Sequence, residues 1–417
     1  MIKKTKILLI SDHALSNTGV ATQSKHLVDG LTKLGKYEIV QLGAAIYHDS
    51  YDLVKVSDDF TIIPVNGFGD KDTIRSMLVS YEPDILIIFS DGRFFNYIFE
   101  MEDEIHQVCP IMWWHVWDNR PTPYFNKIKY DCVDTINCIS ELTFDVCKSV
   151  LGSDKKLFYI PHTVPQDLFF KLDDNDILYH KEKILGKNKN DFLCTWVNRN
   201  IRRKRPADVL KSWQIFLFDL EQKLGHKKAI LIMHTDPYDR AGTNLVEVAK
   251  SLEILDNVRF SDQEASFEKL NILYNISDVV INISQAEGFG LTTLEAMSSG
   301  TPIIATQTGG LIRQLIDKET LLVNGIALKP EVTTISGTQD IPYLNEDFVS
   351  VESAAKALMK VYCMKSKERK SLGDRAINYT RKSFSYNKMI RSWDESIEYT
   401  LSNWKEDYKR VKMEEIV

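Results

Sequence analysis

Short apolar runs, each followed by a segment with helical periodicity, recur along the whole 417-residue chain. In the first half these runs are 6–10, 37–43, 84–89, 110–116 and 135–140, and in the second half they are 192–197, 229–235, 257–261, 279–284 and 302–306. Most are almost continuously apolar rather than alternating, which is typical of parallel strands that are covered on both faces. Two such strand–helix arrays in one chain predict two doubly wound α/β domains.

Two prolines interrupt this pattern in the stretch "YIPHTVPQDLFF", residues 159–170. Prolines between periodic segments are typical of a boundary, so the sequence predicts an N-terminal domain over 1–165 and a second domain over 166–385. Residues 386–417 form an amphipathic helical pattern, with apolar residues at helical spacing from Met389 onward. Residues 328–346 lack helical periodicity and are predicted to be an irregular insertion, with no role assigned.

Composition excludes several classes of protein. The net charge of -6 gives no general attraction to nucleic acid or to an anionic membrane. The six cysteines contain no C-x-x-C pair, which favours buried thiols in a reducing compartment. The apolar run "ILLI" near the start is shorter than a signal peptide needs, and no run reaches the length of a membrane-spanning helix. We therefore expect a cytoplasmic protein without a transmembrane segment.

The stretch "QAEGFGLTTLEAMSSGTP", residues 285–302, carries the most specific chemistry. Glu287 is expected in the loop after the strand 279–284, at the carboxyl end of a parallel sheet, where open α/β sheets bind ligands. Glu295 is expected one turn into the helix that begins near Leu291. The Gly-Phe-Gly turn between them leads into the start of that helix, where free amides and the helix dipole favour an anion.

Two interpretations of the glutamates compete. A glycosidase pair needs a protonated acid for a poor leaving group, whereas helix-end amides suit a leaving group that is already an anion, such as a diphosphate. In the second interpretation, which we favour, the carboxylates accept hydrogen bonds from sugar and ribose hydroxyls. Each such bond to a charged acceptor contributes about 1.5–3 kcal/mol.

These residues resemble a known family. "EGFGLTTLE", residues 287–295, is similar to the E-x7-E motif of retaining glycosyltransferases of the GT-B group known as family 4. "NRNIRRKRP", residues 198–206, resembles the family's Arg and Lys after the first strand of the second domain, with Arg199 and Lys204 in those places. "SNTGVAT", residues 16–22, resembles its N-terminal glycine loop, and His115 stands where the family often has an active-site histidine.

The resemblance implies a role for each of these positions. Arg199 and Lys204 would neutralise the departing diphosphate, Glu287 would bind hydroxyls of the donor sugar, and His115 would lie against that sugar. Glu295 would accept the ribose hydroxyls and Gly19 would border the diphosphate. The rest of the donor site would be the turn and helix start Gly288, Phe289, Gly290, Leu291 and Thr292, with the nucleobase near Arg259 and Phe260.

The resemblance also implies a GT-B fold, with two Rossmann-like domains facing across a cleft and the helix 386–417 crossing back to the first domain. The implied activity is a retaining, hexosyltransferase-like transfer from a nucleotide sugar, such as a UDP or GDP sugar, without metal or other cofactor. The acceptor is left open among a glycan, a lipid-linked sugar, a protein, a small molecule and a modified nucleic-acid base. The chain departs from the family pattern at Asn198 and Arg205, where glycines are usual.

Other interpretations remain beside this one. A run such as "RRKR" is most often a solvated face, and we expect that of Arg202, Arg203 and Arg205. A dinucleotide enzyme is disfavoured because the first strand–helix turn has one glycine and no G-x-G-x-x-G. Another GT-B nucleotide-sugar enzyme, such as an epimerase or a phosphorylase, and a non-catalytic nucleotide-sugar-binding scaffold stay as alternatives.

Overall fold

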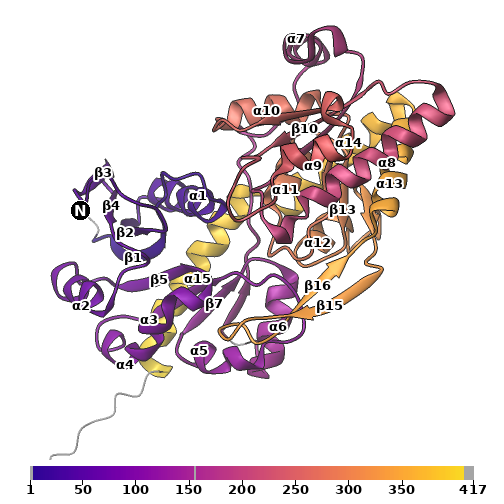
Figure 1. Ribbon diagram of the computed structural model, residues 1–417. Coiled ribbons are helices and arrows are strands. Elements are labelled where there is room, and N and C mark those ends of the chain that lie inside the picture. Colours follow the sequence, from indigo (N-terminus) through magenta and orange to yellow (C-terminus); the bar gives the residue numbers. More distant parts are fainter. Residues whose placement is uncertain (1–2, 155, 408–417) are drawn as a thin grey trace, which may run out of the picture. The chain divides into compact units, whose positions relative to one another are not determined.

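The computed structural model describes residues 3–154 and 156–407, with the side chains of 405–407 excepted. The chain divides into two compact units (Figure 1). The first comprises Met1–His162, Thr338–Pro342 and Asn387–Val417, and the second comprises Thr163–Gly337 and Tyr343–Tyr386. The units divide after residues 162 and 386, close to the predicted bounds 165 and 385, and Thr338–Pro342 groups with the first unit instead of the second. Each unit is described by itself.

The first unit is built on a sheet with the strand order β3-β4-β2-β1-β5-β6-β7-β8. All neighbouring strands are parallel except β3 and β4. The strands are β1 (Thr5–Asp12), β2 (Tyr37–Ala44), β3 (Val54–Ser57), β4 (Phe60–Pro64), β5 (Ile85–Ser90), β6 (Ile111–His115), β7 (Thr135–Cys138) and β8 (Leu157–Tyr159). The α-helices are α1 (Gly19–Lys33), α2 (Lys71–Ser80), α3 (Asn96–Glu100), α4 (Glu102–Ile105), α5 (Lys127–Asp131), α6 (Glu141–Leu151) and, from the end of the chain, α15 (Tyr386–Asp407).

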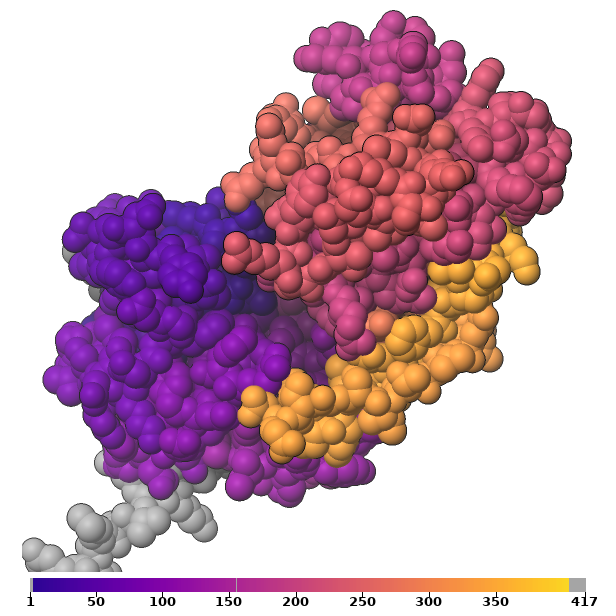
Figure 2. Space-filling model, viewed as in Figure 1, coloured from indigo at the N-terminus to yellow at the C-terminus, as the bar shows by residue number. Residues whose placement is uncertain are grey.

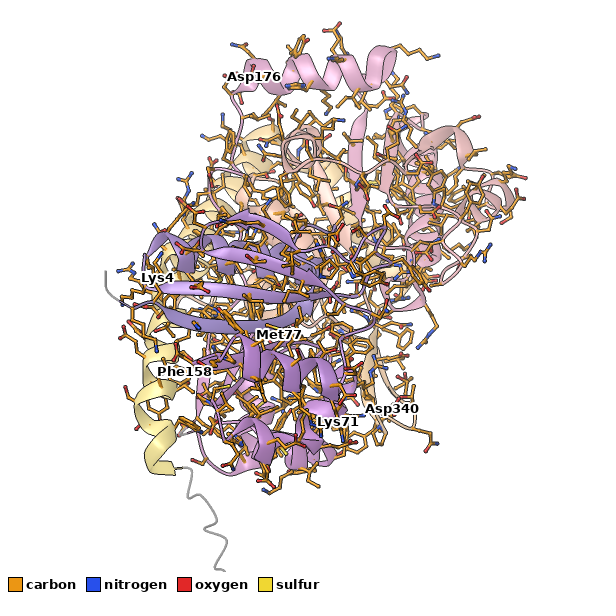
Figure 3. All side chains as sticks on the ribbon, turned by 90° about the vertical axis from the view of Figure 1, so that its left-hand side faces the viewer. Lys4, Lys71, Met77, Phe158, Asp176 and Asp340 are labelled. Carbon is orange, nitrogen blue, oxygen red and sulfur yellow. The ribbon has the colours of Figure 1, made fainter. Side chains whose placement is uncertain are left out.

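Helix α15 packs against β7 of the first unit (Figure 1). Its Ser396 hydroxyl donates to the Asn137 side chain at 2.8 Å, and the Thr400 and Thr135 hydroxyls are 2.7 Å apart. The ring of Phe158 of β8, which Figure 3 labels, lies edge-on to that of Tyr399 of α15. The helix thus completes the core of the first unit although it comes last in the sequence.

The second unit has the sheet order β11-β10-β9-β12-β13-β14, and every neighbouring pair is parallel. Its strands are β9 (Phe192–Val197), β10 (Ala229–His234), β11 (Val258–Ser261), β12 (Val279–Asn282), β13 (Ile303–Thr306) and β14 (Ile326–Leu328), with β15 (Val332–Ser336) and β16 (Leu344–Phe348) as a separate antiparallel pair. Its α-helices are α7 (Asp174–Leu185), α8 (Pro206–Leu224), α9 (Leu245–Ser251), α10 (Phe267–Ile276), α11 (Leu291–Ser298), α12 (Leu311–Leu315), α13 (Val351–Cys363) and α14 (Ser366–Ser383).

Both sheets have the nucleotide-binding order in which the chain starts in the middle, builds one side and then crosses to the other. The prediction of two Rossmann-like domains is confirmed, and each apolar run predicted as a strand contains one. In contrast, residues 328–346 are not irregular, because they contain most of the hairpin β15–β16. Residues 174–185, a mostly polar stretch after the domain boundary, form α7, whose side chains are largely exposed (Figure 2). Among them is Asp176, which Figure 3 labels.

Two further expectations from composition are tested here. Cys109, Cys138, Cys147 and Cys194 are buried, but Cys132 is half-buried and Cys363 is exposed, so the expectation of buried thiols is wrong for these two. Among the residues that the structure describes, no helix is long and apolar enough to span a bilayer.

Candidate functional site

The predicted donor site lies where the strand order of the second unit reverses, between β9 and β12. The loop 198–205 leaves the carboxyl end of β9, and the loop 283–290 leaves the carboxyl end of β12. Because these strands are parallel neighbours, both loops emerge at the same edge of the sheet. The Gln285 amide donates to the Arg203 carbonyl at 2.9 Å, which joins the two loops directly.

Glu287 is the centre of this edge and is 5% exposed. The Lys204 ammonium bonds Oε1 of Glu287, and an Arg203 guanidinium nitrogen lies 3.3 Å from Oε2. Asn282 Nδ2 and the Ser284 hydroxyl each lie 3.3 Å from Oε1. Burial opposes ionisation, but Lys204, Arg203 and Asn282 outweigh it and lower the pKa of Glu287 to about 2. The carboxyl is therefore an anion at neutral pH and serves as a hydrogen-bond acceptor.

The expectation of a solvated face for the basic run next to Lys204 is wrong for Arg203 and Arg205 but holds for Arg202. Arg203 also donates to the Ala286 carbonyl, and its side chain is 31% exposed. The Arg205 side chain is 7% exposed, bonds Asp208 at 2.7 Å and donates to the Val349 carbonyl at 2.9 Å. Only Arg202, with a 70% exposed side chain, projects outward, and it pairs with Glu346. The short 3-10 turn over Arg202–Lys204 directs these adjacent side chains to different partners.

Arg199, predicted to bind the diphosphate, lies on the same loop but pairs with Asp239. Its Nε is 2.7 Å from Oδ2 of Asp239, and its side chain is 69% exposed. This pairing lowers the pKa of Asp239. The structure thus brings Lys204 and Arg203 to Glu287, while Arg199 is held beside the loop that follows β10.

The Gly-Phe-Gly turn shapes the start of α11. Gly290 has φ of 90°, a conformation that favours glycine, and a Cβ there would also lie 2.3 Å from Cδ2 of Leu311, which would have to shift. Gln314 Nε2 donates to the carbonyls of Phe289 at 2.7 Å and Gly290 at 3.1 Å. These bonds from α12 hold the backbone of the turn in place. The first amides of a helix have no acceptor within it, so this arrangement favours an anion in front of α11.

The turn depends on close backbone packing at Gly310. A Cβ on Gly310 would lie 2.4 Å from the Gly288 carbonyl oxygen and 2.6 Å from Cα of Phe289. Gly310→Ala is therefore expected to destabilise the second unit by about 1–3 kcal/mol, the usual range for overpacking. Urea denaturation measures this, and Ile312→Ala, at a 42% exposed position of α12, is the control. Equal stability of both variants would show that the Gly288–Gly310 contact does not constrain the turn.

Glu295, on α11, is also buried, with 7% exposed. The Tyr274 hydroxyl donates to its Oε2 at 2.7 Å. Burial raises the pKa of Glu295 to about 7, although the Tyr274 bond acts in the opposite direction. The two glutamates of the motif therefore differ strongly, since Glu287 is held ionised and Glu295 titrates near neutrality. Leu291 and Thr292, ahead of Glu295 on α11, are half-buried.

The remaining predicted donor residues lie on β11, at the sheet edge. Arg259 donates to the Ile184 carbonyl at 2.9 Å, and Phe260 packs against the main core of the unit. Strand β10 lies between β11 and β9. The structure therefore does not bring these two side chains to Glu287.

His115 and Gly19 belong to the first unit. His115 ends β6 and is 1% exposed, its Nε2 is 2.8 Å from the Tyr130 hydroxyl, and its ring is 4.1 Å from that of Trp113. Gly19 is the first residue of α1, behind the N-cap Thr18, whose hydroxyl donates to Asp12 at 2.5 Å. His115 is thus part of a buried polar contact, and Gly19 lies at the carboxyl end of the sheet.

Several residues of the site escaped the sequence interpretation. Asn282, Ser284 and Gln314 support Glu287 or the turn through side-chain hydrogen bonds. One signal was present, because Asn282 and Ser284 interrupt the apolar run 279–284 at its carboxyl end. Gln314 lies a full strand and turn beyond the motif and left no such signal.

Comparison with known proteins agrees with this geometry. Residues 180–337 match the family model described as glycosyl transferases group 1. These residues are a glycosyl transferases group 1 domain. The match confirms the expected glycosyltransferase family for this part of the chain.

Curated relatives match over part of their length. The chain is 41% identical over 146 residues to D-inositol 3-phosphate glycosyltransferase of Corynebacterium diphtheriae, which is 34% of this chain and 33% of the relative. It is 22% identical over 178 residues to N-acetyl-alpha-D-glucosaminyl L-malate synthase of Bacillus anthracis, covering 43% of this chain and 42% of the relative. The chain thus covers about a third of the length of the first of these glycosyltransferases.

Solved structures match over nearly the whole chain. Sucrose-phosphate synthase from Thermosynechococcus elongatus superimposes with a TM-score of 0.73 at 14% identity, covering 96% of this chain and 100% of that one. Anabaena HepE in complex with UDP and glucose superimposes with a TM-score of 0.68 at 13% identity, covering 95% and 100%. At these identities the similarity concerns the fold, and it confirms the GT-B fold.

Proposed function

We propose that the protein is a glycosyltransferase that moves a sugar from a nucleoside-diphosphate sugar to an acceptor hydroxyl, with retention of anomeric configuration. The observation that carries the proposal is the buried Glu287, held by Lys204 and Arg203 beside the start of α11 in a group 1 domain. This combination provides a cationic site and a fixed hydroxyl acceptor at one sheet edge.

The charge distribution supports a diphosphate leaving group. Lys204 and Arg203 carry positive charge, and the amides of Gly290 and Leu291 at the start of α11 add partial positive charge. Arg199, which is exposed and held by Asp239, completes the proposed cationic set. Preorganised positive groups of this kind stabilise charge that develops on a departing group, so we propose that transfer needs no metal ion or other cofactor.

The low pKa of Glu287 decides between two chemical roles. A general acid must carry a proton at neutral pH, and Glu287, with a pKa of about 2, does not. We assign Glu287 to binding hydroxyls of the donor sugar. In the proposed reaction the acceptor oxygen bonds to the anomeric carbon as the bond to the diphosphate breaks, and a diphosphate oxygen takes the acceptor's proton.

The other predicted residues would line the rest of the donor site. Glu295 would accept the ribose hydroxyls, Gly19 would border the diphosphate, and the base would lie near the backbone of Arg259 and Phe260. We assign no step to His115, because it is 1% exposed and its Nε2 is engaged by Tyr130. All six cysteines are unpaired, which suits a reducing compartment, and we propose a cytoplasmic location.

A thermal-shift screen tests the donor assignment. The protein is heated with UDP, GDP, ADP, TDP or NAD, each with and without EDTA. A ligand at 100 times its dissociation constant stabilises the folded state by about 2.7 kcal/mol. We expect stabilisation by one nucleoside diphosphate, unchanged by EDTA and reduced in Lys204→Ala and Arg199→Ala. Stabilisation by NAD alone, or by none of the five, would contradict the proposal.

Product analysis separates the remaining alternatives. The curated relatives' names include inositol 3-phosphate and L-malate, so a phosphorylated polyol and a hydroxy acid are the first acceptors to offer. Transfer with retained configuration supports the proposal. An altered sugar without transfer would indicate an epimerase, dependence on inorganic phosphate would indicate a phosphorylase, and donor binding without turnover of any acceptor would favour a scaffold.

A further inference from the structure

The hairpin β15–β16 has a role that the motifs do not reveal. The strands pair antiparallel, with Thr333 opposite Asp347 and Thr334 opposite Glu346. β16 carries two adjacent acidic residues that are buried, Glu346 at 7% exposed and Asp347 at 9%. Buried carboxylates are costly unless they are paired or hydrogen-bonded, so their partners show what the hairpin does.

Asp347 binds the loop that carries Glu287 and the turn beyond β13. Its Oδ2 accepts from the Thr308 hydroxyl at 2.7 Å, and its Oδ1 accepts from the Thr333 hydroxyl at 2.7 Å. Its backbone amide donates to the Gln285 carbonyl at 2.8 Å. Thr308 lies two residues before Gly310, whose amide donates to the Glu287 carbonyl at 2.8 Å. Asp347 therefore holds the backbone at Gln285, two residues before Glu287, and the turn whose Gly310 bonds the Glu287 carbonyl.

The neighbours of Asp347 on the same strand hold the second loop. Glu346 receives both terminal nitrogens of Arg202, at 2.5 and 3.2 Å. The Arg205 guanidinium lies 5.2 Å from the centre of the Phe348 ring. Arg202 and Arg205 flank Arg203 and Lys204 in the sequence, so β16 fixes the segment that supplies the cations of the site.

We propose that β16 is a positioning element of the donor site and that Asp347 is its principal positioning residue. The inference rests on the proposed function, because β16 is proposed to set the distance between Lys204 and Glu287 in the donor site. One strand, Leu344–Phe348, contacts both site loops, and the hydrogen bond from Gln285 to Arg203 joins these loops next to it. Small displacements of catalytic groups have large kinetic effects, so such a clamp is expected to control the site without touching the substrate.

Asp347→Ala tests the inference in the full-length protein. With the nucleoside diphosphate that stabilises the wild type as the titrant, we expect calorimetry to show about tenfold weaker binding, because the loops that carry Lys204 and Glu287 lose a common anchor and shift. The KM for the nucleotide sugar should rise with it. Asp347→Asn keeps one acceptor oxygen and should restore part of the affinity. The control is Glu331→Gln, because Glu331 immediately precedes β15 and its side chain accepts from Ser350 and not from a site loop.

Thr308→Val provides a second variant if Asp347→Ala does not fold. Thr308→Val removes the Thr308–Asp347 bond from the other side with little change in volume, together with the 3.3 Å contact of the same hydroxyl to the Gln285 carbonyl. Combined with Asp347→Asn it should give a non-additive effect on affinity. Equal affinity in the folded Asp347→Ala, Thr308→Val and control proteins would overturn the inference while leaving the donor site intact. A wild type that binds no nucleoside diphosphate would instead overturn the proposed function itself.

Discussion

Lys204→Ala is expected to lower kcat/KM for the nucleotide sugar by about 100- to 1,000-fold, the range seen when one preorganised electrostatic contact to a transition state is removed. Lys204 bonds Glu287 and its side chain is 13% exposed, so solvent does not replace its charge efficiently. Steady-state kinetics with the donor identified by the thermal-shift screen measures the effect. Hydrolysis of the donor serves as the readout before an acceptor is known.

Lys211→Ala is the matched control for Lys204→Ala. Lys211 lies on α8, only seven positions further along the chain, and its side chain contacts Gln214 at the surface. The same loss of one positive charge there should leave kcat/KM unchanged. If both variants lose activity equally, net charge rather than the Lys204–Glu287 contact explains the loss.

The fold was largely predictable because its strands are buried on both faces. A parallel strand between two helical layers is apolar at nearly every position, as in β5, where all residues from Ile85 to Ser90 are buried. The hairpin β15–β16 lacks that signal. Val332 is 56% exposed and Ile335 is 71% exposed, so β15 has no buried face to produce alternation.

The site was predictable where strand ends and motif spacing determine it. Glu287, Glu295 and Lys204 lie where the pattern indicates, in or after loops at the carboxyl edge of the sheet. The choice among adjacent cations was not predictable. Arg205 has φ of 53°, and this left-handed residue follows a 3-10 turn, so neighbours in "RRKR" point in different directions that no periodicity describes.

The position of the His115 side chain was not predictable for a similar reason. A residue at the end of a parallel strand faces either the ligand edge or the helical layer, and the sequence does not show which. In the structure the bond to Tyr130, from α5, holds His115 inside the first unit. The partner that decides its position is 15 residues away in the sequence and belongs to a different element.

Glu295→Gln is expected to stabilise the protein at neutral pH. Burial raises the pKa of Glu295 from 4.5 to about 7, so between these values the folded protein keeps a proton that the unfolded chain has released. The free energy of unfolding therefore decreases as pH rises from 4.5 to about 7, and the contribution of the bound proton is lost above about 7. At about 1.4 kcal/mol for each pH unit, the loss reaches about 3 kcal/mol.

Urea denaturation at several pH values tests this expectation. The glutamine variant and the wild type should be equally stable near pH 4, and the variant should gain up to about 3 kcal/mol by pH 8. The amide oxygen of the introduced glutamine would still accept from the Tyr274 hydroxyl, so the bond observed at 2.7 Å can persist. Glu268→Gln, at an exposed position of α10, controls for the loss of one negative charge. A stability difference that does not change with pH would contradict the assignment of the shifted pKa to Glu295.

Glu295→Gln should also bind the donor more weakly. The buried carboxyl of Glu295 would then contribute to donor binding, which offsets its cost to stability. A neutral amide oxygen accepts a weaker hydrogen bond from ribose hydroxyls than a carboxylate does, and we expect about tenfold lower affinity for the nucleoside diphosphate at pH 8. Wild-type affinity should also fall as pH decreases below about 7, because Glu295 then becomes protonated, whereas the affinity of Glu295→Gln should stay constant. Calorimetric titrations from pH 6 to 8 with both proteins measure this. Parallel pH profiles would show that Glu295 does not contact the donor, and its burial would then need a structural explanation through Tyr274.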